Sequence, residues 1–397
     1  MNKNWRGAWT LVGLTAAGAA PAQTGDLNYQ LHGFASQAYA QSWGNNYVGD
    51  SLDGSFAFYE LGLNATAGGG PVTVSAQALY RRFGDLDREG ARLDYAFADY
   101  RFLSALDAHA GVRLGRVKNP YGFFNDSRDV VFTRPGILLP GSVYFEGSGV
   151  RSLLFSSDGG QLYGGWNAGD HFLSLTAGRA LNFTASDDQK RSLFGSEGFS
   201  GDVDIDGLTV VRLLDEWAAG TWRAALTYTS AELSFDGEQQ VAPGFSVPIS
   251  GTFDTDLYIA SIAYNAERYS LTAEYLLTRF KGRFNGDTDR NSGDGVYVQA
   301  DYRFLPGWTG MLRYDLSFSD RNDRSGRDYA RSTGGDRHER FARDLTAGLK
   351  WLPDEHWGVW VEQHFIVGSA TVPRLENQDR RIESTGQLFL VMVGYHF

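Results

Sequence analysis

The segment from Val296 to Phe304 reads Val-Tyr-Val-Gln-Ala-Asp-Tyr-Arg-Phe and alternates between two kinds of side chain. One face carries Val296, Val298, Ala300, Tyr302 and Phe304, and the other carries Tyr297, Gln299, Asp301 and Arg303. Because successive side chains of an extended strand point to opposite faces, this period of two predicts a β-strand with one nonpolar face. A soluble sandwich alternates in the same way, so this strand alone does not decide the fold class.

Neighbouring segments repeat the pattern and keep their charges in mid-strand. In residues 308–318, Arg313 and Asp315 occupy the polar phase, and in residues 345–367 Lys350, Glu362 and His364 do so. The apolar phase ends in Trp, Tyr or Phe near the turns, which is typical of the aromatic girdles at the two surfaces of a membrane. The pattern favours a barrel with a polar interior, whose lumen wall is predicted to include Asp301, Arg303, Arg313, Asp315, Lys350 and Glu362.

Sixteen such segments fill the chain, joined by connections that are alternately short and long. They are expected near 28–40, 54–67, 72–84, 91–103, 107–117, 150–166, 171–181, 206–214, 221–235, 253–264, 269–282, 295–304, 308–319, 342–352, 357–368 and 385–397. The longer polar connections are 182–205, 236–252, 320–341 and 369–384. Short turns at one end and long loops at the other are the plan of transmembrane β-barrels. The predicted fold class is therefore all-β: a closed antiparallel transmembrane barrel of about 16 strands.

The final residues place Phe389, Val391, Val393, Tyr395 and Phe397 on one apolar stripe that ends in an aromatic residue. Here the sequence resembles Gram-negative outer-membrane porins, in which such an end is the signal for the barrel-assembly machinery, so Tyr395 and Phe397 are expected to serve in this way. The general plan is similar to that of trimeric sixteen-stranded porins and distantly to that of the phosphate-selective porin family. The resemblance implies a homotrimer whose third outer loop folds into the lumen. The arginine ladder and lysine cluster of the phosphate-selective family are not evident, so that specificity is not carried over.

Composition excludes several other classes. The chain has 397 residues, no cysteine and a formal charge of −11, from 36 Lys and Arg against 47 Asp and Glu. Disulfide and thiol chemistry are therefore excluded. The acidic balance without basic runs disfavours nucleic-acid binding, and no long uncharged apolar run beyond the N-terminus predicts a membrane-spanning helix. The 49 glycines and 14% aromatic residues suit many strands and turns.

The first 22 residues have the organisation of a cleavable signal peptide. Lys3 and Arg6 precede an apolar run from Ala8 to Ala20, and Ala20-Pro21-Ala22 has the form of a cleavage site. The expected mature chain, 23–397, is the barrel domain and carries a net charge of −13 (−11 − 2). The predicted location is the Gram-negative outer membrane.

The connection 118–149 differs from the other loops because it is rich in apolar residues such as Phe123, Val131 and Ile137. Such groups gain roughly 1.5–3 kcal/mol each from burial, so the segment must pack against something. Folding inward against the barrel wall would satisfy this requirement and form a constriction. The charged residues expected to line it, from this loop and the facing wall, are Arg81, Arg92, Asp94, Arg113, Lys118, Asp126, Arg128, Asp129, Arg134, Glu146 and Arg151. Opposed charges of this kind set selectivity in pores, although Asp126, Arg128 and Asp129 also suit local salt bridges that only brace the loop.

Two further polar segments have alternative interpretations. Residues 287–295 space oxygen-bearing side chains like a calcium loop, but Ser292 stands where glycine is required and Val298 where the bidentate glutamate belongs. A solvated outer turn is the favoured interpretation there. Residues 321–341 hold six arginines among acids, a composition suited to lipopolysaccharide phosphates or a neighbouring subunit. A solvated, salt-bridged loop is favoured over that interaction.

Catalysis has little support in the sequence. The seven histidines show no paired metal-ligand spacing, and no nucleophile or phosphate-binding motif opens a helix. An outer-membrane phospholipase-like barrel is the enzyme alternative, with His364 beside Glu362 as the nearest approach to a catalytic group. A non-conducting structural barrel is a further alternative, but about sixteen strands enclose an aqueous lumen unless plugged.

Together these features predict a porin that forms a water-filled channel for passive diffusion of small hydrophilic solutes or ions, without enzyme activity, cofactor or metal. A channel selective for anions such as phosphate or carboxylates is the alternative. The expected partners are outer-membrane lipid and lipopolysaccharide, the barrel-assembly machinery, further copies in a homotrimer and small hydrophilic solutes, but no nucleic acid.

Overall fold

The computed structural model describes residues 27–145, 154–194, 198–242, 244–284 and 287–397. Sixteen long strands in these ranges form one antiparallel sheet, and the two-residue β8 (Phe183–Thr184) pairs with β9. The long strands are β1 (Asn28–Trp43), β2 (Ser55–Gly69), β3 (Val72–Phe83), β4 (Asp87–Ser104), β5 (Ala108–Lys118), β6 (Ser156–Ala168), β7 (His171–Ala180), β9 (Phe199–Trp217), β10 (Trp222–Ala242), β11 (Phe245–Asn265), β12 (Tyr269–Phe284), β13 (Asp287–Leu305), β14 (Trp308–Phe318), β15 (Phe341–Trp351), β16 (Trp357–Gly368) and β17 (Thr385–His396).

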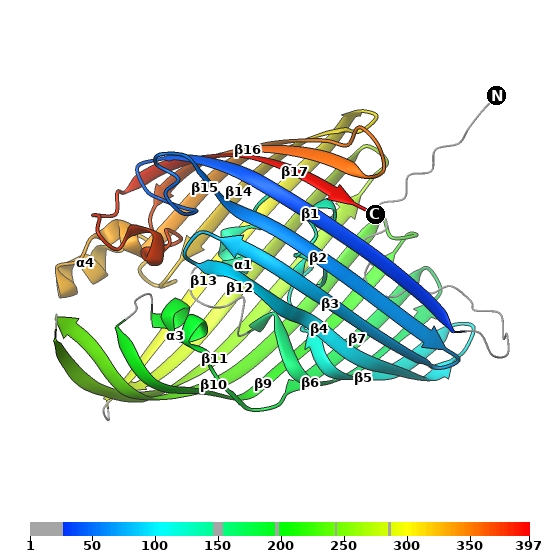
Figure 1. Cartoon of the computed structure of the whole chain (residues 1–397), viewed down its shortest axis with the longest axis horizontal. Coiled ribbons are helices and arrows are strands. Elements are labelled where there is room, and N and C mark those ends of the chain that lie inside the picture. The colour runs from blue at the N-terminus through cyan, green and yellow to red at the C-terminus, as the bar shows by residue number, and fades with distance from the viewer. Residues whose placement is uncertain (1–26, 146–153, 195–197, 243, 285–286) are drawn as a thin grey trace.

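The sheet closes on itself where the first strand pairs with the last. Strands β1 and β17 run antiparallel from Phe34 opposite His396 to Trp43 opposite Gln387. Just beyond the ladder, Phe397 and Gly33 exchange two backbone hydrogen bonds of 3.0 and 3.2 Å. Closure removes the unpaired edges that the sheet would otherwise expose. The prediction of a closed antiparallel barrel of sixteen strands is confirmed (Figure 1).

The connections are short at one end of the barrel and long at the other (Figure 1). The long-loop end carries α3 (Asp187–Phe194) and α4 (Arg327–Thr333), whereas α1 (Gly141–Tyr144) lies in the connection between β5 and β6. None of the helices in the described part of the chain is long and apolar enough to cross a membrane.

Two expected loops are strands instead. Residues 236–252, predicted as a polar loop, largely extend the β10–β11 ladder, in which Gly237 pairs with Ile249. Residues 287–295, interpreted as a solvated turn, form the first half of β13 and pair with β12. A polar stretch continues as a strand when a partner satisfies its backbone hydrogen bonds, so limits placed by polarity alone make these strands too short. Strand β9 likewise begins at Phe199, inside the expected loop 182–205.

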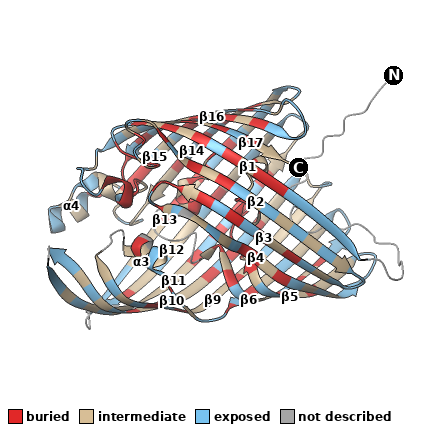
Figure 2. Ribbon diagram, viewed as in Figure 1, coloured by how far each residue is buried: buried red, intermediate tan, exposed pale blue. Residues whose placement is uncertain are grey.

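The two faces of the barrel differ as the alternation predicts. On β13, Val298 is 54% and Tyr302 52% exposed, whereas Tyr297 and Gln299, the two neighbours of Val298, are each 1% exposed. Figure 2 shows this striping of exposed and buried positions along the strands. We call the two sides the exposed face and the buried face.

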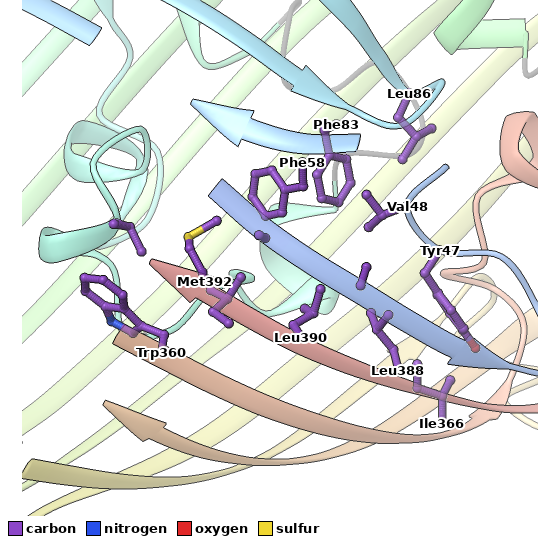
Figure 3. Close-up of a cluster of buried hydrophobic side chains, with 14 of the residues drawn as sticks. Tyr47, Val48, Phe58, Phe83, Leu86, Trp360, Ile366, Leu388, Leu390 and Met392 are labelled. Carbon is purple, nitrogen blue, oxygen red and sulfur yellow. The ribbon is translucent and has the colours of Figure 1, made fainter. Parts of the chain in front are cut away.

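The buried face is not polar throughout. A cluster on β16, β17, β1 and β2 contains Trp360, Leu388, Leu390, Met392 and Phe58, and Figure 3 shows these side chains together with Tyr47 and Val48 of the first long loop. Val131 and Ile137, from the connection between β5 and β6, complete it. We call this part of the buried face the apolar wall.

Candidate functional site

The connection between β5 and β6 makes the contacts that define the candidate site. Its described part, which we call the 119–145 segment, contains α1 and two short 3-10 helices, Asn125–Ser127 and Val131–Thr133. Each element is far shorter than the roughly 12–15 residues below which an isolated helix is only marginally stable in water. The conformation of the segment must therefore come from its contacts with the sheet.

Glu60 on β2 is the first anchor of the segment. Its side chain is fully buried and accepts hydrogen bonds from both terminal nitrogens of Arg134, at 3.1 and 2.8 Å. Arg81 on β3 donates to the same carboxylate at 3.0 Å. A carboxylate between two guanidinium groups is a strong, directional arrangement when water is excluded. Arg134 is therefore held against the strand wall.

Glu274 on β12 is the second anchor. It is 1% exposed and accepts the backbone N–H of Phe123 at 2.9 Å and the hydroxyl of Tyr144 at 2.7 Å. Tyr297 and Ser261, on the two neighbouring strands, donate to it at 2.6 Å each. One carboxylate thus joins both ends of the segment to three adjacent strands.

Asp315 and Glu362 accept hydrogen bonds from backbone N–H groups in the second half of the segment. The N–H of Ser142, in α1, lies 3.2 and 3.3 Å from the two oxygens of Asp315. Glu362 accepts from the N–H of Ile137 at 2.6 Å and of Leu138 at 3.3 Å. Arg313 donates to the carbonyl of Leu138 at 3.1 Å. Three residues predicted for the lumen wall are thus brought together, but as supports for the segment.

Apolar contacts supplement these anchors at two places. Val131 and Ile137 pack on the apolar wall. Phe123, Phe124, Val143 and Tyr144 join a second cluster with Leu257, Ile259 and Tyr297 on the opposite strands. The apolar composition of 118–149 is explained by this burial, as expected from the hydrophobic effect.

Most charges predicted for the constriction are paired. Asp126 bonds Arg212 of β9 at 2.8 Å, and Lys118 contacts both Asp94 and Asp129. The Arg128 guanidinium lies over the ring of Phe155, 3.8 Å from its centroid. Of Asp126, Arg128 and Asp129, for which the sequence left local bracing open, Asp129 pairs with Lys118 at the start of the connection, whereas Asp126 pairs with a distant strand. Glu146 and Arg151 lie outside the described residues.

The facing wall arginines are paired in the same way. Arg81 bonds Asp87 at 2.5 Å in addition to Glu60, and Arg92 bonds Asp87 at 2.6 Å. Arg113 bonds Asp99 at 2.8 Å and lies over the ring of Tyr163. These side chains belong to the adjacent strands β3, β4 and β5. The register places Arg113 opposite Asp99, in the row of Thr73, so it lies eight residues along the strands from Arg81, which is opposite Gly90.

Two cavities of about 440 Å³ each adjoin the 119–145 segment. The outer cavity lies toward the long-loop end, between Arg128 and Asp129 of the segment, Arg92 and Arg116 of the wall, and Gln189 of α3. The inner cavity reaches the short turns and is bounded by Phe123, Phe124 and residues 133–136 of the segment. The segment therefore contributes to the lining of a cavity toward each end of the barrel.

Sequence reasoning missed Glu60, Glu274 and Arg212. Each occupies the polar phase of an expected strand, so alternation alone places it on the buried face. What marks Glu274 and Glu60 as anchors is the partner far away in the chain, which alternation does not reveal.

The His364 ring has both nitrogens engaged. Nδ1 lies 2.7 Å from Asp344 and Nε2 3.3 Å from Glu362, and the side chain is buried. A general base needs a ring nitrogen within reach of a substrate proton. The arrangement instead orients Glu362, which holds the segment.

The other two motifs also have structural roles. Residues 287–295 lie in a paired strand, and the described residues contain no group of three or more metal-ligating side chains. In the arginine-rich connection 319–340, Glu339 pairs with Arg374 and Asp336 with Arg381 of the neighbouring connection. The solvated, salt-bridged interpretation fits these contacts.

Comparisons with known proteins agree on the fold. No protein-family model matches the chain, and no curated protein matches its sequence. Among solved structures, the outer membrane protein OmpT of Vibrio cholerae is 10% identical with a TM-score of 0.58, covering 95% of this chain and 99% of its own. The anion-selective porin from Comamonas acidovorans is 15% identical with a TM-score of 0.54, covering 94% of this chain and 100% of its own. Salmonella typhi OmpF, in a complex with daunomycin, is 15% identical with a TM-score of 0.55, covering 93% and 97%. The chain has the fold of Gram-negative outer-membrane porins.

Proposed function

We propose that this protein is an outer-membrane porin: a water-filled channel through which small hydrophilic solutes diffuse passively. The observation that carries the proposal is the pair of cavities that the 119–145 segment helps to line, one toward each end of a closed sixteen-strand barrel. The exposed face supports a membrane location, because it is apolar along its strands. The signal peptide at 1–22 and the homotrimer belong to the same proposal, and the trimeric form of OmpT from Vibrio cholerae supports the latter.

The 119–145 segment is the proposed constriction. Its anchors are carboxylates on four strands around the buried face, so the segment spans the lumen rather than following one wall. Arg128 and Asp129 border the outer cavity, and Asp126 pairs with Arg212, so these charges shape the local field.

Reconstitution in a planar bilayer tests this function. The wild-type protein should conduct in steps of three if each subunit of a homotrimer holds one pore. Deletion of residues 122–145 should enlarge the conductance and blunt ion selectivity, because the segment no longer occupies the lumen. Unchanged conductance in a variant that still shows heat-modifiable migration, the mark of a folded barrel, would place the segment outside the pathway. No conductance from folded wild-type barrels would overturn the channel itself.

An anion preference is the second candidate. The outer cavity is lined by six cationic and four acidic side chains, a balance that favours anions at this mouth. The reversal potential under a salt gradient measures the preference directly, and a cation-selective or unselective reading would remove this candidate.

A further inference from the structure

The inner cavity has a mixed electrostatic lining. Five cationic side chains and four acidic ones border it: Arg134, Arg223, Arg268, Arg303 and Lys350, with Glu216, Glu267, Asp301 and Glu362. The outer cavity also carries charges of both signs, but its six cationic and four acidic side chains are further from balance. Charges of both signs around one enclosed space favour a ligand that itself carries both signs.

Strand register sorts these charges into two neighbouring rows. One row across β13 to β16 reads Asp301, Met311, Gly348 and Glu362, and the next row toward the short turns reads Arg303, Thr309, Lys350 and Trp360. The first row is acidic and the second basic. Gly348 lies in the middle of the acidic row, where a Cβ would approach the Met311 methyl group to 2.7 Å. The missing side chain lets Met311 pack closely over this position.

The acids of the cavity differ in what already binds them. Glu362 is occupied by His364 and by the N–H groups of Ile137 and Leu138. Glu216 is bound by Arg223 at 2.6 Å. Asp301 accepts hydrogen bonds from neutral groups, the amide of Gln299 at 2.9 and 3.1 Å and the hydroxyl of Ser270 at 3.4 Å, and the cations whose charges act on it are Lys350 and Arg313. Asp301 keeps acceptor capacity for a cationic group.

The basic row offers the complementary charge. Lys350 is 9% exposed, so its ammonium group acts where water screens little. Arg303 stands in the same row and donates to the backbone carbonyl of Glu267, which fixes it at the cavity rim. A carboxylate placed here meets two cations, whereas an ammonium group placed here is repelled.

We propose that the inner cavity is a binding subsite for a small zwitterion with the chemistry of a free amino acid. The ammonium group binds Asp301, and the carboxylate binds Lys350 with Arg303. Phe123 and Phe124 border the same space and leave an apolar side for an aliphatic side chain. A pure anion would face Asp301 and a pure cation would face Lys350, so each gains less than the zwitterion. This inference rests on the proposed channel function and adds a preferred class of solute.

Three probes of similar size separate these contributions. Leucine carries both charges, 4-methylpentanoate lacks the ammonium group and 3-methylbutylamine lacks the carboxylate. Each is titrated against the ion current of the reconstituted wild-type channel. Leucine should reduce the current with a half-maximal concentration about tenfold lower than either analogue, because only leucine bonds the acidic and the basic side chains at once. Leucine methyl ester and N-acetyl-leucine should lose the same advantage.

Variants then assign the two charges. Asp301→Asn should bring the half-maximal concentration of leucine close to that of 4-methylpentanoate, and Lys350→Gln should bring it close to that of 3-methylbutylamine. Asp204→Asn and Lys281→Gln make the same chemical changes toward the long-loop end of the barrel. There the Thr184 hydroxyl donates to Asp204, and Lys281 pairs with Asp254. These controls should leave the leucine titration unchanged.

The outcomes distinguish this subsite from the channel. If wild-type barrels conduct but the three probes act within twofold of one another, the subsite is refuted and the channel stands. A leucine titration that neither Asp301→Asn nor Lys350→Gln alters would also refute it. If either variant fails to assemble, the ester and the N-acetyl derivative still decide, because they delete the same charges from the solute. Absence of any wild-type current refutes the channel and the subsite together.

Discussion

Two groups of side chains on the buried face hold the 119–145 segment by different means. Glu274 on β12 and Asp315 on β14 are buried carboxylates, whereas Trp360 on β16 and Leu390 on β17 belong to the apolar wall. The segment meets the carboxylates through its backbone N–H groups and the apolar wall through packing of Val131 and Ile137. Directional hydrogen bonds therefore fix one side of the segment, and nonpolar contacts fix the other.

The largest effect is expected at Glu60, where the two chemistries meet. Glu60→Gln removes the charge between Arg81 and Arg134 and leaves two buried guanidinium groups without their shared carboxylate. Breaking a buried ion pair on one side costs about 3–5 kcal/mol. The free energy of unfolding, from urea titration in detergent, should fall by that order, and the conductance should fluctuate because residues 133–138 lose an anchor.

The control for Glu60 is Glu232→Gln on β10, whose side chain is exposed. It should change the unfolding free energy little. Equal losses in both variants would show that Glu60 is not an anchor.

A smaller effect separates the two faces of one strand. Leu390 is fully buried on the apolar wall, and Val391 points to the other face. Leu390→Ala should cost about 3 kcal/mol through lost contacts and a residual cavity, while Val391→Ala should cost about 1 kcal/mol. The same urea titration measures both. A larger loss at Val391 would mean that the apolar wall is not covered as described.

The smallest effect concerns Glu376, in the connection between β16 and β17. It is buried and accepts N–H groups of Asp85 and Leu86, which dock that connection on the link between β3 and β4. Burial, with the nearby Asp85 charge, raises the pKa of Glu376 from 4.5 to about 7. The unfolded chain therefore loses its proton first, and stability should fall as the pH rises from about 4.5 to 7 and then level off.

Glu376→Gln keeps an acceptor oxygen and removes the titration. The difference in unfolding free energy between wild type and this variant should change across that pH window, whereas Glu355→Gln, at an exposed turn, should run parallel to the wild type. A constant difference between wild type and Glu376→Gln from pH 4 to 8 would contradict the raised pKa.

The sequence predicts the barrel well because alternation and turn spacing are local signals repeated many times. The exposed stripe of Val298 and Tyr302 follows from period two, and the number of strands follows from the spacing of the turns. Closure was inferred from the even number of strands and the alternately short and long connections. Strand ends are less predictable, as β11 shows: Ser246 and Ser250 look like loop residues, yet cross-strand pairing keeps them extended.

The site was predictable only in part. The apolar composition of 118–149 correctly indicates burial, but which wall residue holds which part of it depends on contacts across the barrel, as between Glu274 and Phe123. One signal was present and unused: in Leu388–Val393 both phases are apolar, so both faces of that strand need a nonpolar neighbour. This pattern marks the apolar wall and hence the side on which the segment packs.

The seam between β1 and β17 also determines the order of events during assembly. Residues 33–43 pair with residues 387–397, at the other end of the chain. The first strand therefore keeps one edge unpaired until the last strand is in place. Contacts between such distant parts of a chain form late, because the intervening loop must first be closed. Until this pairing forms, the sheet has two unpaired edges, at which another chain could pair and aggregate. A chaperone that covers the free edge of β1 would therefore protect the chain at the stage when aggregation is most favoured.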